Sequence, residues 1–367
     1  MPLYKALFLC LKREYESMND MVPATKVPLS NYLMDWKNIY SKNQCHFYFS
    51  DVGARGGLEA PWDEYSPIIE TVAFEPDQTE YENLKKSSNF KVLNYGLSSV
   101  EEKISLNLIK QRGCSSSLTP NNDFLRQFPE FSRWQIEKVQ EMDCKPLDSF
   151  LKSGELPPIS FIKLDTQGTE LGILEGAKES LKYSSGIQVE VEFQKLYLNQ
   201  SLFSEVDQFI RNELGLELHD LRKTYWKYDT EKTAYNQKGK LVFGDALYFR
   251  PLHNLDSWLS EIAPEQQKQV LINSLFTAFL YGYMDYCYKL LESGVCNEIL
   301  GTAAGDIRTI LDSYNSSLVS FLPPIWKSRI GARLKVLGSI FRVVNYRGWA
   351  TSGERLGAEK KFGSFIS

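Results

Sequence analysis

Three acidic side chains directly follow short apolar runs in the first half of the sequence. Asp51 follows "HFYFS", Glu75 follows "VAF" and Asp165 follows "FIKL". In an open α/β sheet, ligands bind beyond the carboxyl ends of the strands. The glycines of "DVGARGG" let the backbone turn sharply behind Asp51 and leave room for a ligand. The sequence therefore predicts a negatively charged site for a small molecule at this edge of a sheet.

The acid that ends the first run indicates the charge of the ligand. A carboxylate would repel a pyrophosphate but suits S-adenosyl-L-methionine, which carries an ammonium group and a sulfonium. Glu75 follows roughly 20 residues later, where such folds place the acid that binds the ribose diol. We expect S-adenosyl-L-methionine as the cofactor, bound by Asp51, Gly53, Ala54, Gly57, Glu75, Pro76, Asn94 and Gly96. The alternatives are a turn capped by Asp51 and a nicotinamide-dependent dehydrogenase, although a true G-x-G-x-x-G is lacking.

Further acids near the end of the later strands are candidates for the chemical step. Asp165 would lie at the mouth of the sheet, near a transferable methyl group. Glu190 and Glu192 share one face of the run "QVEVEF". We expect Asp165 and Glu192 to be catalytic, and Ser116, Glu170 and Glu190 to contact the acceptor. Helix capping by Glu170 and an exposed edge for the two glutamates remain as structural alternatives. No metal-binding pattern stands out, and no metal is predicted.

Alternating strand and helix patterns must position these residues. Between residues 46 and 193, short β-type runs alternate with amphipathic helical ones, which predicts an α/β fold with a mostly parallel sheet. Beyond that, two β segments joined by a polar loop, 216–221 and 239–250, predict a terminal antiparallel hairpin. The long polar and aromatic segment 110–135 is typical of a functional loop, and we interpret it as a lid over the acceptor.

The chain divides into three regions by pattern. An N-terminal helical extension covers residues 1–45, the α/β domain covers 46–250, and a helical region with a basic tail covers 251–367. Residues 326–361 contain nine Lys or Arg and two Glu. This basic stretch includes an amphipathic helix that would either contact a membrane or a lipid-linked substrate, or pack on the core with its basic face in solvent.

Composition limits the remaining possibilities. A net charge of −4 over 367 residues carries no nucleic-acid signature. The six cysteines form no CxxC pair, which indicates free thiols in a reducing compartment. Neither a signal peptide nor a run of 18 apolar residues is present. We therefore expect a cytoplasmic protein that acts on a small-molecule or glycan acceptor and not on nucleic acid.

Residues 46–250 resemble the FkbM methyltransferases. The resemblance is carried, in order, by "SDVGARGG", "AFEPD", "GCSSSLTP", "PLDSFL", "ISFIKLDTQGTELGILEGA", "VEVEFQKLY" and "LVFGDALYFR". It implies a Rossmann-like class I fold with a seven-stranded, mostly parallel sheet that ends in an antiparallel hairpin. It also implies methyl transfer from S-adenosyl-L-methionine, usually to an oxygen of a sugar, polyketide or related metabolite. The sequence departs from the family at Arg55, where Asn is usual, and at Gln167, where Glu is usual. A non-catalytic scaffold that retains the fold is therefore the alternative.

Overall fold

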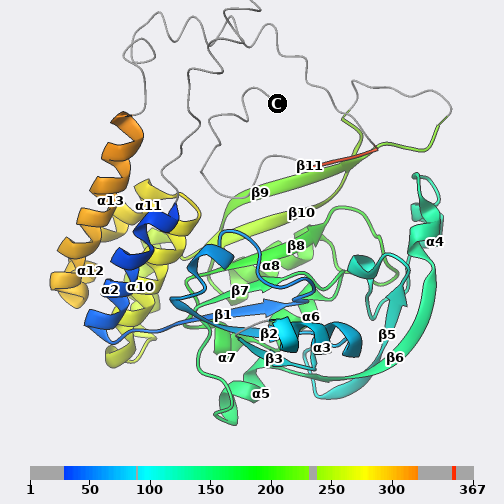
Figure 1. The fold of residues 1–367 in the computed structure, drawn as a ribbon, viewed down its shortest axis with the longest axis horizontal. Coiled ribbons are helices and arrows are strands. Elements are labelled where there is room, and N and C mark those ends of the chain that lie inside the picture. The colour runs from blue at the N-terminus through cyan, green and yellow to red at the C-terminus, as the bar shows by residue number, and fades with distance from the viewer. Residues whose placement is uncertain (1–28, 88–89, 231–237, 321–348, 353–367) are drawn as a thin grey trace, which may run out of the picture.

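The computed structural model describes residues 29–87, 90–230, 238–320 and 349–352. Its main sheet has eight strands in the order β11-β9-β10-β8-β7-β1-β2-β3 (Figure 1). These strands are β1 (Phe47–Val52), β2 (Ile69–Phe74), β3 (Lys91–Leu93), β7 (Phe161–Leu164), β8 (Gly186–Glu192), β9 (Glu217–Trp226), β10 (Lys240–Phe249) and β11 (Ala350–Ser352).

Strand direction in the main sheet agrees with the sequence. Strands β3, β2, β1, β7 and β8 are parallel neighbours. The hairpin of β9 and β10 then joins β8 antiparallel. The predicted fold, a mostly parallel sheet with a terminal antiparallel hairpin, is confirmed. The eighth strand is an addition, because β11 pairs with β9 at the outer edge of the hairpin.

A second, three-stranded sheet was not predicted. It consists of β4 (Gly96–Leu97), β6 (Ile136–Lys145) and β5 (Glu102–Ile109) in that order. Most side chains of β6 are polar and exposed, so its sequence lacks the apolar alternation that marks a half-buried strand. The predicted lid lies between β5 and β6 and contains three short helical turns, at Arg112–Cys114, Asn122–Leu125 (α4) and Phe131–Trp134.

Helices cover both faces of the main sheet and extend beyond it at one end. In Figure 1, the helices α2 and α10 to α13 gather at one side of the molecule, and β5 and β6 lie at the opposite side. The longer helices are α2 (Leu33–Asn43), α3 (Gln78–Ser87), α8 (Phe203–Glu213), α10 (Pro264–Leu280), α11 (Met284–Glu292), α12 (Gly294–Leu300) and α13 (Thr302–Ser320). The shorter ones are α5 (Leu147–Lys152), α6 (Glu170–Glu175), α7 (Lys178–Leu181) and α9 (Leu255–Ser260).

The helical region is divided into separate helices, and a glycine and a proline mark two of the helix ends. Within the helical region expected from residue 251 onwards, α10 ends at Leu280 and α11 begins at Met284. Gly282 between them has a φ of +81°, which reverses the chain as glycine does after many helices. Pro264 opens α10 at its first turn, where a missing amide hydrogen costs nothing.

An aromatic core joins α10 to one face of the main sheet. Phe276 of α10 lies 5.1 Å from the ring of Trp36 in α2 and 5.2 Å from that of Phe47 in β1. Trp62 stacks 4.5 Å from Phe49 of the same strand. All of these rings are at most 2% exposed. The helices from both ends of the described chain therefore share one core with the sheet.

Three further expectations concern the basic tail, membrane spans and cysteines. The basic amphipathic helix, which the sequence places at residues 326–344 of the basic stretch, lies outside the described residues. In the described part of the chain, no helix is both long and apolar enough to span a bilayer. The five described cysteines are free thiols, as predicted from their spacing.

Candidate functional site

The end of β1 carries a buried carboxylate. Asp51 is 2% exposed, and its Oδ1 has no hydrogen-bond partner among the described residues. Lys163, its neighbour in β7, places Nζ 3.8 Å from that oxygen and 3.6 Å from Glu59. Burial raises the pKa of Asp51 to about 6, although the Lys163 charge lowers it in part. Asp51 therefore remains largely ionised at neutral pH and can accept a hydrogen bond from a cationic ligand.

Gly53 allows the loop after β1 to pass close to the end of β7. Its φ is +79°, and a Cβ atom there would lie 2.1 Å from the carbonyl oxygen of Asp165. No side chain fits this position without moving the backbone. The amides of Gly53 and Ala54 both donate to the carbonyl of Phe74, at 3.1 and 3.3 Å, which ties the loop to β2. Gly57 closes the turn by donating to Ala54.

The end of β2 carries the second predicted acid. Glu75 is 5% exposed, and its Oε1 accepts from the amide of Asp77 at 2.9 Å. Burial raises the pKa of Glu75 to about 7. Asn94, expected to contact the cofactor, donates its amide to the carbonyls of Glu75 at 2.9 Å and Pro76 at 3.4 Å. Gly96 starts β4, where a Cβ atom would meet the sulfur of Cys144 at 2.6 Å.

A glutamine joins two of the predicted acids near the end of β7. Gln167 Nε2 donates to Asp165 Oδ1 at 2.9 Å and to Glu190 Oε2 at 2.5 Å. Its Oε1 accepts from the hydroxyl of Tyr197 at 3.0 Å. Gln167 has a φ of +60°, an unusual conformation for a residue other than glycine. The structure thus brings Asp165 and Glu190 together through the residue that departs from the family pattern.

Burial perturbs the two glutamates of β8. Burial and then the charge of Asp165 raise the pKa of Glu190 well above its ordinary value. The pKa of Glu192 is also raised well above it, by burial and then by Glu170. Glu192 is 2% exposed, and its Oε1 has no hydrogen-bond partner in the part of the chain that the structure describes. Burial therefore favours the protonated form of both carboxyl groups.

Two predicted acceptor residues shape the turn that follows β7. Glu170 is buried, and its carboxylate accepts from the amide of Thr166 at 2.8 Å and from that of Gly168 at 3.0 Å. Ser116, from the predicted lid, donates its hydroxyl to the carbonyl of Gln167 at 2.8 Å. Both side chains thus hold the backbone on which Asp165 and Gln167 stand.

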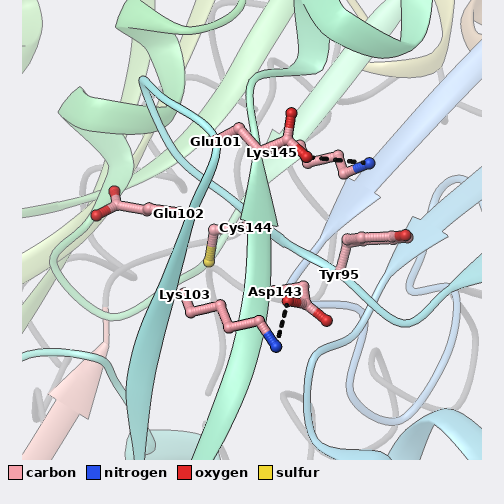
Figure 2. A pocket seen from close by; sticks show the side chains of 7 residues that line it. All are labelled: Tyr95, Glu101, Glu102, Lys103, Asp143, Cys144 and Lys145. Atoms are coloured by element: carbon pink, nitrogen blue, oxygen red, sulfur yellow. Dashed lines mark ion pairs between the residues drawn. The ribbon is translucent and has the colours of Figure 1, made fainter.

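A hollow lies apart from these acids, between β5 and β6. Its volume is about 380 Å³, and its lining residues are Tyr95, Glu101, Glu102, Lys103, Asp143, Cys144 and Lys145 (Figure 2). Lys103 pairs with Asp143 at 3.4 Å and Lys145 with Glu101 at 3.5 Å. Burial raises the pKa of Cys144 to about 11, so its thiol stays protonated and is a poor nucleophile. Within the described residues, no group of three or more His, Cys, Asp or Glu is arranged to hold a metal ion.

Sequence reasoning missed two residues that hold the segment after Glu75. Gln140 of β6 donates to the carbonyl of Pro76 at 2.9 Å, and Arg55 pairs with Asp77 at 2.6 Å. Arg55 was noted only as a departure from a family pattern. Gln140 gave no signal, because its strand was not predicted and the contact joins residues far apart in sequence.

Comparison with known proteins identifies the family. The methyltransferase FkbM domain matches residues 51–218. A methyltransferase FkbM structure from Methylobacillus flagellatus is 13% identical over 58% of this chain and 47% of its own, about half its length, with a TM-score of 0.31. A magnesium protoporphyrin IX methyltransferase from Synechocystis, solved with bound SAM, is 7% identical over 62% of this chain and 80% of its own, with a TM-score of 0.29.

No curated protein matches the sequence. The matched domain begins at Asp51, the acid that ends β1, and runs through β8 into the first strand of the terminal hairpin. It therefore contains Glu75 and the acids around Gln167. On the strength of this match and of the strand order that accompanies it, the chain contains a methyltransferase FkbM domain, residues 51–218, on a class I, S-adenosyl-L-methionine-dependent methyltransferase fold.

Proposed function

We propose that this protein transfers the methyl group of S-adenosyl-L-methionine to an oxygen atom of a glycan or secondary metabolite. The buried carboxylates of Asp51 and Glu75, at the ends of adjacent parallel strands, are the observation that carries the proposal. The Oδ1 of Asp51, which forms an ion pair with Lys163 but no hydrogen bond to a described residue, can accept a hydrogen bond from an ammonium group. Glu75 uses one oxygen for the amide of Asp77, and its second oxygen is suited to a ribose hydroxyl. The residues at this edge therefore fit the cofactor of the family.

The acids beside the donor residues favour a neutral acceptor. S-adenosyl-L-methionine supplies an electrophilic methyl group on a positively charged sulfur. An acceptor hydroxyl must lose its proton when it attacks, and a positioned base typically accelerates such a step by about 10²–10⁴-fold. Asp165, Glu190 and Glu192 supply carboxyl groups that can exchange a proton in this step. These acids offer hydrogen bonds to a hydroxyl but no counter-charge to a phosphate or carboxylate, so a hydroxyl of a sugar or similar metabolite fits best.

Calorimetric titration with S-adenosylhomocysteine tests the donor half of the proposal. The wild-type protein should bind this product and should not bind NAD. Glu75→Gln should weaken binding by roughly tenfold, because a neutral amide accepts hydrogen bonds from the ribose less strongly than a carboxylate does. Glu70→Gln is the matched control, because Glu70 lies at the opposite end of β2 and its side chain is 56% exposed. Tight binding of NAD, or equal effects of the two variants, would refute the donor assignment.

Labelled methyl transfer tests the acceptor half. The protein is incubated with methyl-labelled S-adenosyl-L-methionine and a cell extract, and the labelled product is treated with mild alkali. A methyl ether on a hydroxyl keeps its label, whereas a methyl ester releases methanol. Release of the label contradicts transfer to a hydroxyl. Because N-methyl and C-methyl groups also resist alkali, a retained label supports O-methylation only if carbon-13 NMR of the labelled product shows a methoxy carbon. Binding of S-adenosylhomocysteine without any transfer would favour the non-catalytic scaffold.

A further inference from the structure

The short segment that follows Glu75 is held by Arg55, a residue without a role in the proposed reaction. Arg55 Nη2 lies 2.6 Å from Asp77 Oδ2, and Nη1 lies 3.3 Å from Glu80 Oε2. The amide of Gly56 also donates to Glu80, at 3.1 Å. One arginine and its neighbour therefore fasten the loop after β1 to the first turn of α3.

The same segment is held from the opposite side by the second sheet. Gln140 of β6 donates to the carbonyl of Pro76 at 2.9 Å, and Asn94 donates to the same carbonyl at 3.4 Å. Pro76 immediately follows Glu75 in the chain. The position of the Glu75 carboxylate therefore depends on contacts from the loop after β1, the loop after β3 and a strand of another sheet.

Three carboxylates meet at this segment, and Arg55 is the cation that faces them. The negative charges of Asp77 and Glu80 raise the pKa of Glu75, and the positive charge of Arg55 lowers it. Asn94 and Gln140, which approach from β3 and β6, are neutral. Asp77 is buried and Arg55 is 29% exposed, so solvent screens this group only in part.

We propose that Arg55 is a positioning residue for the donor: through Asp77 and Glu80 it holds the Glu75 carboxylate where it accepts from the ribose hydroxyls. This inference rests on the proposed function, because it requires a ribose at Glu75. Without Arg55, the repulsion of Asp77 and Glu80 is no longer offset. Glu75 then holds its proton to higher pH and accepts hydrogen bonds less well at neutral pH.

Titration of Arg55→Met with two ligands tests the proposal. S-adenosylhomocysteine and 5′-methylthioadenosine are titrated calorimetrically between about pH 6 and 9, a range that spans the pKa of Glu75 near 7. At neutral pH, both ligands should bind roughly tenfold more weakly than to the wild type. The pH at which affinity reaches half its maximum should rise by about one unit. Both ligands should respond alike, because both contain the ribose and only one contains the amino acid.

Companion variants separate charge from position. Arg55→Lys keeps the charge and should keep the pH midpoint, but it should lose part of the affinity because an ammonium cannot hold both carboxylates in a fork. Gln140→Leu should weaken both ligands without moving the midpoint, because no charge changes. Glu80→Gln removes a carboxylate and should move the midpoint to lower pH, opposite to Arg55→Met.

Arg112→Met is the matched control. Arg112 forms an ion pair of similar length with Glu137, at 3.1 Å, outside the donor loops, and its loss should change neither affinity nor midpoint. The proposal fails if folded Arg55→Met keeps the wild-type midpoint, if only S-adenosylhomocysteine is affected, or if Glu80→Gln moves the midpoint upward. Should the wild type bind neither ligand, the proposed function itself is wrong.

Discussion

The two halves of one face of the main sheet differ sharply in chemistry. Towards the amino ends of the parallel strands, this face carries the aromatic side chains of Phe47, Phe49, Phe161 and Phe249, which belong to the core shared with α10. Towards the carboxyl ends, the same face of these strands carries Asp51, Lys163 and Asp245, and the intervening strand β8 adds Glu190. On β1 and β7 a step of two residues, from Phe49 to Asp51 and from Phe161 to Lys163, separates packing from charge, and on β10 the step from Phe249 to Asp245 is four residues.

The two halves of this face contribute to the free energy of folding with opposite signs. Burial of aromatic rings is the dominant favourable term in folding. Burial of carboxylates such as Asp51 opposes folding, and it persists because those groups have a role other than stability. We therefore expect substitutions in the aromatic half to lower stability without changing ligand affinity. Substitutions that remove a buried charge in the other half should weaken ligand binding while raising stability.

The largest effect is expected in the aromatic half, at Phe276. This ring is fully buried and contacts Trp36 and Phe47. Phe276→Ala should lower the free energy of unfolding by about 3–5 kcal/mol, because it leaves a cavity. Chemical denaturation measures this loss. Val139→Ala, at a side chain that is 54% exposed, should change it by no more than about 0.5 kcal/mol.

The affinity of the same variant sharpens the comparison. Below the onset of its unfolding, Phe276→Ala should bind S-adenosylhomocysteine within about twofold of the wild type, because distant sites act independently. A large loss of affinity in the folded variant would show that the two halves are coupled and not separate.

The second effect has the opposite sign and lies in the charged half, at Asp51. Its pKa is about 6 in the folded protein and 3.8 in the reference state, so the folded protein binds more protons between these values. The free energy of unfolding therefore falls as pH rises through this window. Asp51→Asn does not titrate and should be more stable than the wild type above pH 6, by up to about 3 kcal/mol. The difference should vanish below the lower pKa.

Denaturation curves at several pH values measure this gain, and calorimetry measures its consequence for binding. The stabilised Asp51→Asn variant should bind S-adenosylhomocysteine at least roughly tenfold more weakly, because the charged partner of the ammonium group is gone. Glu70→Gln, on an exposed part of β2, should alter neither quantity. If Asp51→Asn were both less stable at high pH and unchanged in affinity, the separation of this sheet face into a stabilising half and a ligand-binding half would be refuted.

The smallest effect concerns an exposed ion pair in the second sheet. Lys103 and Asp143 lie 3.4 Å apart, with side chains that are 71% and 58% exposed. Asp143→Asn should change the free energy of unfolding by no more than about 1 kcal/mol, and by less at high salt. Denaturation at low and high ionic strength measures it. A change in the free energy of unfolding as large as that expected for Asp51→Asn would contradict the view that solvent exposure weakens the contribution of this ion pair.

Local patterns predicted where Asp51, Gly53 and Glu75 lie in the fold. Asp51, Gly53 and Glu75 each stand at the end of a strand, and strand ends are marked by a run of apolar residues and a turn. Parallel strands then bring such ends to one edge, so the sequence order alone placed them together. The terminal hairpin was predicted for the same reason, because its two strands are neighbours in the chain.

Contacts that depend on which elements are neighbours in space were not predicted. The hydrogen bond between Gln167 and Glu190 forms because β7 and β8 are adjacent in the sheet. The spacing of the two residues in the sequence does not show that their side chains meet. Gln140 lies on a strand with mostly exposed polar residues, so its periodicity carried no signal. The roles of Arg55 and Gln140 became visible only when their partners were located.

The pairing of β11 with β9 has a consequence for how the protein may be shortened. Ala350, Thr351 and Ser352 cover part of an edge that would otherwise present unpaired backbone groups, and Trp349 lies 5.4 Å from Trp226 beside it. An uncovered edge is a template on which another chain can add a strand. A version truncated before residue 349 would therefore expose the unpaired edge of β9. Self-association of that version would result from the exposed edge and would say nothing about methyl transfer.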